Sequence, residues 1–220
     1  MRLFTSAMYL AGTLLLLDGQ HAAAQTRDQV KPRFGLELLT SGVDATQAEN
    51  AGVGKRAWGA QFAAGVTLLH VVNVSAEAGG MGLSDNAQFT QPTTEGDKAS
   101  SVTAGLASLA LGLQTPSFRL EPGKPAALSV GVSAGRTWLN AHRSIQRCAD
   151  CRSEDVQISA GSFWEPGVRL EMGFWGISAR YRVYGGDSDL RDALMIGYYS
   201  AMGGRGPRAT ETDEPADETR

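Results

Sequence analysis

This 220-residue chain has two groups of residues whose types and spacing could support chemistry. The first group is its only two cysteines, Cys148 and Cys151. In an oxidising compartment this pair is expected to form a disulfide, which would contribute about 2 kcal/mol across so short a loop. Haem attachment would require histidine where Arg152 stands, and a redox motif would open a helix in a βαβ unit, which the sequence does not predict. Zinc would need His142 or Asp150 to join the thiolates, and four good ligands are not evident. We therefore predict a disulfide, no metal and no cofactor.

The second group is His142 and Ser144, followed in the chain by Glu154 and Asp155. A serine nucleophile needs a base within hydrogen-bond reach and an acid that orients the base, so these residues could support acyl transfer to lipid A. A polar loop rich in arginine is more typical of a solvated segment, or of contact with lipopolysaccharide phosphates. The arginines in question are Arg143, Arg147 and Arg152. We predict a non-enzymatic protein and keep a lipid A-modifying enzyme as an alternative.

The elements that must position these residues are predicted to be strands, because apolar residues recur at every second position. Glycine is also unusually common, with 27 residues. Eight segments qualify, each long enough to cross a membrane when tilted. They are 33–38, 58–68, 72–79, 101–113, 128–135, 164–172, 177–184 and 193–202. The segment 101–113 is apolar on both faces, so its register stays open.

The connections between these segments alternate in length, as expected when long outer loops and short periplasmic turns join the strands of an outer-membrane barrel. The long polar connections are Thr40–Arg56, Ser84–Ser100 and Leu139–Val156, and the short ones are Leu69–Val71 and Gly173–Trp175. Two connections fit this scheme less well. Gln114–Pro125 is long for a periplasmic turn, and Gly185–Arg191 is short for an outer loop.

The orientation of the two faces decides the class of barrel. A secreted, water-soluble barrel would bury the apolar face and leave the charges solvated, and this alternative stays open. Small residues interleaved with the charges favour the opposite orientation, with a crowded polar interior of an eight-stranded barrel. Buried charges there must pair, because breaking a buried pair costs about 3–5 kcal/mol. We predict an interior charge network of Glu37, Glu77, Glu165, Arg169, Glu171, Arg180 and Arg182.

The two ends of the chain are predicted to lie outside the barrel. Residues 1–24 read as a signal peptide, with an apolar stretch from Ala7 to Leu17 that is too short to span a membrane. The barrel domain is then 25–202, and the acidic segment 203–220 is predicted to be disordered. The net charge of −3 argues against a nucleic-acid partner.

The strand texture, such as Pro166-Gly167-Val168-Arg169-Leu170 and Ala179-Arg180-Tyr181-Arg182, resembles the opacity-protein and OmpA-like transmembrane β-barrel families. The resemblance covers residues 33–202 and implies an all-β, eight-stranded antiparallel up-and-down barrel in the bacterial outer membrane. Family members serve as structural barrels, adhesins, host-interaction surfaces or narrow pores. Such barrels often end on an aromatic residue, whereas here an acidic tail follows Tyr198 and Tyr199. From the resemblance we predict a monomer with a structural or surface-interaction role, and we keep a narrow pore as an alternative. The expected partners are outer-membrane lipid, lipopolysaccharide and an unidentified extracellular or host ligand.

Overall fold

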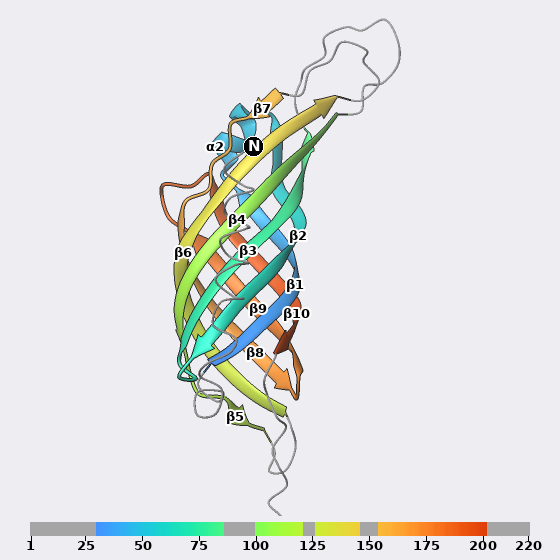
Figure 1. Ribbon diagram of the computed structural model, residues 1–220. Helices are drawn as coiled ribbons and strands as arrows, with labels where there is room; N and C mark the ends of the chain where they lie inside the picture. Colours follow the sequence, from blue (N-terminus) through green and yellow to red (C-terminus); the bar gives the residue numbers. More distant parts are fainter. Residues whose placement is uncertain (1–29, 86–99, 121–125, 146–153, 202–220) are drawn as a thin grey trace, which may run out of the picture.

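Eight long antiparallel strands close into one barrel in the computed structural model, which describes residues 30–85, 100–120, 126–145 and 154–201 (Figure 1). Each of these strands pairs with the next one along the chain, and β1 pairs with β10 to complete the ring. The strands are β1 Val30–Val43, β2 Val53–Leu68, β3 Val72–Asp85, β4 Ser100–Gln114, β6 Ala126–Ile145, β8 Ser162–Met172, β9 Trp175–Tyr184 and β10 Leu190–Ala201. The predicted fold class is thereby confirmed.

The two ends of the barrel differ. At one end, here called the turn end, β2–β3 and β8–β9 are joined by tight turns. Leu69 and His70 have φ values of 53° and 61°, and Gly173 has a φ of 76°. Positive φ at two successive residues is typical of the hairpin turns that match strand twist. The opposite end, here called the α2 end, carries the helix α2 (Ala45–Asn50) and the short strand β7 (Glu154–Val156) (Figure 1).

The strands extend further towards the α2 end than the sequence predicted. β1 continues to Val43 and β2 begins at Val53, so the predicted Thr40–Arg56 loop is mostly strand and helix. Asp44 caps α2 by accepting hydrogen bonds from the backbone of Thr46 and Gln47, as an N-cap side chain does. β6 likewise runs to Ile145, inside the connection predicted as Leu139–Val156.

The length of the Gln114–Pro125 connection also has a structural reason. Its two-residue strand β5 (Phe118–Arg119) folds back and pairs with Leu128 and Ala127 of β6. The described part of the connection therefore adds a short strand to the turn end of the barrel. The predicted signal peptide, the tail 203–220 and both cysteines lie outside the described residues.

Apolar side chains cover the outer surface of the barrel, and charged side chains fill part of its interior. Leu36 and Leu38 are 60% and 68% exposed, whereas Glu37 between them is 4% exposed. The register of 101–113 is settled by β4, where Val102, Ala104 and Leu106 point inward and Leu109, Leu111 and Leu113 point outward. The apolar-out orientation is the reverse of a water-soluble barrel. In the described part of the chain, no helix is long and apolar enough to cross a membrane.

The interior is divided into two zones. Towards the α2 end it is apolar, with a cluster of buried residues beneath the helix. Its members include Leu39, Met81, Leu83, Leu106 and Met195 from the strands, Ala48 from α2, and Val156 and Ile158 from the segment that holds β7. Towards the turn end the interior is polar, and this zone holds the predicted charge network.

Candidate functional site

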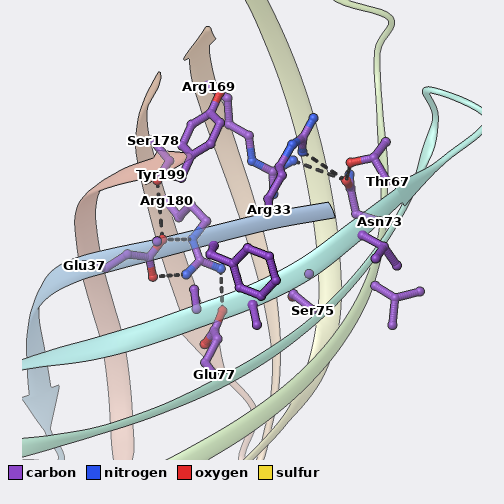
Figure 2. Close-up of a pocket in the computed structure, with 17 residues that line it drawn as sticks. Arg33, Glu37, Thr67, Asn73, Ser75, Glu77, Arg169, Ser178, Arg180 and Tyr199 are labelled. Carbon is purple, nitrogen blue, oxygen red and sulfur yellow. Dashed lines mark hydrogen bonds and ion pairs between the residues drawn. The ribbon is translucent and has the colours of Figure 1, made fainter. Parts of the chain in front are cut away.

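Arg180 of β9 is the centre of the polar zone. Its Nη1 donates to Glu77 and to Glu165, each at 2.6 Å, and its Nε donates to Glu37 at 3.1 Å. Nη2 also pairs with Glu37. Figure 2 shows this guanidinium reaching from β9 towards Glu37 on β1 and Glu77 on β3. One side chain therefore joins three other strands across the barrel.

Arg182, two residues further along β9, completes this central layer. It donates to Glu77 at 2.7 Å and to Glu165 at 2.8 Å, and its Nη1 also donates to the hydroxyl oxygens of Ser108 and Thr137. Its guanidinium carbon lies 3.7 Å from the centroid of the Phe163 ring, a cation–π geometry. Arg182 is 1% exposed. A buried charge is tolerated only when paired and hydrogen-bonded, and this guanidinium is both.

An uncharged side chain links the carboxylates of the central layer. Gln61 of β2 donates from Nε2 to Glu37 at 2.8 Å and to Glu77 at 3.2 Å. Both oxygens also accept from an arginine, Glu37 Oε2 from Arg180 and Glu77 Oε2 from Arg182, so Gln61 adds a second donor to each. The predicted charge network did not include Gln61, although Gln61 points inward like Glu77, while Trp58 and Phe62 on the same strand point outward.

A second polar layer lies nearer the turn end. Arg33 of β1 forms an ion pair with Glu171 of β8 at 3.0 Å, and its guanidinium carbon lies 5.8 Å from the Tyr199 ring centroid. Arg169 was predicted to pair with a carboxylate, and here the structure differs. Its Nη1 donates instead to the amide oxygen of Gln114 at 2.7 Å and to that of Asn73 at 3.3 Å. Figure 2 shows Arg169 and Asn73.

The structure thus brings together five of the seven predicted network residues in one cluster and places the other two in a neighbouring layer. Glu37, Glu77, Glu165, Arg180 and Arg182 form the central layer. Glu171 and Arg169 join Arg33, Asn73 and Gln114 at the turn end. The sequence pattern placed Arg33 on the correct face. The predicted network did not include it, because it is the first residue of the predicted strand.

The wide side chains of the polar zone fit because glycines stand opposite several of them. Glu37 is paired with Gly197 and Arg180 with Gly167 in the strand register. A Cβ placed on Gly167 would lie 3.0 Å from Cγ of Arg180, and one on Gly197 would overlap Cγ of Glu37. These glycines are needed for close approach across the ladder.

Side chains fill the barrel along its axis. Two small cavities of about 50 and 30 Å³ lie at the polar zone. Beyond it, the apolar cluster closes the interior beneath α2. Cavities that bind organic ligands are usually several hundred Å³, so these two are sized for water or a small ion.

The possible catalytic residues at the α2 end do not assemble. His142 and Ser144 both point outward from β6, and His142 Nδ1 lies 2.7 Å from a carboxylate oxygen of Asp155. The Ser144 hydroxyl instead hydrogen-bonds Ser101 at 3.0 Å. No hydrogen bond joins Ser144 to His142 in the described structure, so the nucleophile–base contact that acyl transfer requires is not formed.

Arg143 does not serve the surface role that its sequence position suggested. It points inward, pairs with Asp85 at 3.2 Å and donates to the backbone oxygens of Ala51 and Gly52. It therefore fastens the end of α2 to β3 and β6. Its burial differs from both alternatives that the sequence left open, a solvated loop and contact with lipopolysaccharide phosphates. Arg147 and Arg152 lie outside the described residues, as do Cys148 and Cys151, whose disulfide stays a prediction that thiol titration of the non-reduced protein would test.

The short connection between β9 and β10 is fixed by side-chain hydrogen bonds. Ser162 donates from its hydroxyl to Asp187 at 2.9 Å, and the backbone N–H of Ser162 donates to the same carboxylate. These bonds hold the pKa of Asp187 below its usual value. Asp189 accepts in the same way from Ser159. The connection is compact because its carboxylates bind the neighbouring backbone.

Comparison with known proteins gives a likeness of fold. No protein-family model and no curated protein matches the sequence. Two crystal structures of Ail, the attachment invasion locus protein of Yersinia pestis, are similar, one of them in complex with the heparin analogue sucrose octasulfate. That complex is 14% identical, with a TM-score of 0.44, and the other structure is 13% identical, with a TM-score of 0.39. Each match covers 79% of this chain and 97% of Ail. At these identities the likeness assigns no role to any residue.

Proposed function

We propose that this chain is a non-enzymatic outer-membrane β-barrel protein with a structural or surface-interaction role. The observation that carries the proposal is the inverted distribution of side chains. Large apolar residues are exposed around the barrel, including Leu36, Leu38, Phe62, Leu109, Leu111, Val132 and Ile196. Exposing this surface to water would cost about 25 cal/mol per Å², whereas lipid covers it without that cost.

The limits of the apolar surface support insertion in a bilayer. On β2, the outward residues from Trp58 to Leu68 are all apolar over 11 residues, the length that a tilted strand needs to cross a membrane. Trp58 lies towards the α2 end. At the turn end, Trp175 stacks on Tyr198 with ring centroids 5.9 Å apart. Aromatic residues at both limits are expected where a barrel meets the two membrane interfaces.

Basic side chains next to this boundary support contact with lipopolysaccharide. Arg56 is exposed two residues beyond Trp58, and Lys55 is exposed beside it. Arg191 is exposed on β10, and its Cβ lies near Gly42, which pairs with Arg56. These residues, and not Arg143, are positioned to bind lipid phosphates by charge-assisted hydrogen bonds.

The filled interior favours a structural or surface role over conduction. The central layer spans the barrel with ion pairs, and the apolar cluster lies between it and the α2 end. An ion would have to displace both to pass. Steady, large single-channel conductance in planar bilayers would contradict this part of the proposal.

Membrane fractionation tests the proposal as a whole. We expect the full chain, expressed with residues 1–24, to sediment with outer membranes and to migrate faster on gels when it has not been heated. Treatment with carbonate should leave it in the membrane pellet. Recovery in the periplasmic or extracellular fraction would contradict the proposal. Unchanged lipid A on overexpression, in wild type and in Ser144→Ala alike, is expected of a protein without acyl-transfer activity.

A further inference from the structure

The polar layer at the turn end has more hydrogen-bond donors than acceptors. The Gln114 Oε1 atom accepts from Arg33 at 3.2 Å, from Arg169 at 2.7 Å and from the Asn73 amide at 2.9 Å. The Asn73 Oδ1 atom accepts from both arginines and from the Thr67 hydroxyl. Each oxygen has two lone pairs and is approached by three donors, so the amides cannot satisfy both guanidiniums.

The charges in this layer are unbalanced in the same direction. Arg33 is paired with Glu171, but no carboxylate of the described residues lies within 4.0 Å of Arg169. The central layer has the opposite imbalance, because Arg180 and Arg182 face three glutamates. The polar zone is thus neutral as a whole and locally positive around Arg169.

Two cavities meet at this positive layer, and Arg169 lines both of them. Arg33 Nε and Tyr199 Oη are buried at the 50 Å³ cavity and have no hydrogen-bond partner in the described structure. Ser129 Oγ is buried without a partner at the 30 Å³ cavity. Three orphaned polar atoms around two cavities show that this layer lacks something to accept their hydrogen bonds.

We propose that the turn-end layer binds a small inorganic anion between Arg33 and Arg169. An anion supplies the missing acceptor and the missing negative charge together, whereas water supplies only an acceptor. The 50 Å³ cavity suits a halide with one or two waters and is too small for an organic ligand. Chloride, which is abundant outside cells, is the chemical class that fits.

Thermal unfolding of the purified full chain in an uncharged detergent tests this site. Chloride is compared with gluconate, which is too large for the cavity, at equal ionic strength. We expect chloride well above its dissociation constant to raise the unfolding midpoint by about 2–4 °C. Arg169→Gln should abolish the difference between the two salts. Arg119→Gln, which removes an exposed arginine on β5 at the same end, should preserve it.

A second variant keeps the test decisive if Arg169→Gln does not fold. Gln114→Glu places a carboxylate between the two guanidiniums at almost constant size. It should raise the midpoint in gluconate and remove the response to chloride. A bromide soak should place its anomalous density between Arg33 and Arg169. Equal wild-type midpoints in chloride and gluconate, an undiminished chloride response in Arg169→Gln or Gln114→Glu, or bromide bound only at the surface would overturn the proposal.

Discussion

Gly197 of β10 lies directly opposite Glu37 of β1, and the space that a side chain on Gly197 would fill is occupied by the side chain of Glu37. The Glu37 carboxylate can then turn along the barrel to meet Arg180 and Gln61. The network therefore depends on a residue that has no side chain.

Replacing Gly197 with valine should break this arrangement. The new side chain would push Glu37 away from Arg180 and leave a buried guanidinium short of a partner. We expect a loss of about 3–5 kcal/mol in the free energy of unfolding, measured by denaturant titration in detergent. Gly105→Ala is the control, because a Cβ there meets nothing within 4 Å. Equal stability of the two variants would show that Glu37 has room to move.

Neutralising Arg180 tests the central layer itself. Arg180→Met keeps most of the side-chain volume and leaves Arg182 as the only cation beside three buried carboxylates. We expect a loss of stability of about 3–5 kcal/mol, again by denaturant titration.

A double variant identifies the cause of that loss. Adding Glu37→Gln to Arg180→Met removes one of the unpaired charges and should recover part of the stability. Arg56→Met, at an exposed arginine on β2, should change stability by less than about 1 kcal/mol. Full additivity of the Glu37 and Arg180 changes would contradict the ion pair.

Alternation along single strands was enough to predict which residues of the polar zone point inward. It could not show which inward residues meet, because partners are set by the closure of the barrel and lie far apart in the chain. Arg33 and Glu171, for example, are 138 positions apart. Arg169 was assigned to a carboxylate for this reason, although the side chains that meet it across the barrel are amides from β3 and β4.

The strand residues nearest the α2 end were not predicted, and the physical reason is different. Period two is visible only where one face meets lipid and the other meets a polar interior. Near the α2 end, β4 packs Val102 and Leu106 inward on the apolar cluster, whereas Leu109 and Leu111 point outward further along the strand. The large apolar residues change face within one strand, so its register is hidden in the sequence. Where β6 continues past Trp138, its outer face becomes polar, and the sequence resembles a loop.

The β2–β3 turn should be open to stabilisation. Leu69 and His70 both have positive φ, which costs a residue with a side chain about 1–2 kcal/mol. Replacing them with Asn-Gly, the sequence that such turns favour, should raise the unfolding free energy by about 1–2 kcal/mol.

The β8–β9 turn allows the backbone strain of positive φ to be introduced instead of removed. Gly173→Ala places a side chain at a φ of 76°, where nothing crowds its Cβ, so any loss is conformational. We expect it to lower stability by about 1 kcal/mol.

At the β2–β3 turn, a loss of stability in the Asn-Gly variant would contradict the prediction made there. It would show that Leu69 and His70 make contacts that stabilise the protein by more than the strain costs.

A single charge on the outer surface distinguishes lipid from water as its surroundings. Leu38 is 68% exposed midway along β1, so Leu38→Arg would place a guanidinium against lipid chains. We expect it to lower stability in bilayers by about 2–4 kcal/mol and to reduce the heat-modifiable form in outer-membrane fractions. Thr103→Arg adds the same charge at an exposed outward position nearer the α2 end of β4, where the neighbouring outward residues Ser101 and His142 are polar, and should be tolerated. A fully tolerated Leu38→Arg would mean that this face meets water, and it would remove the main support for the membrane assignment.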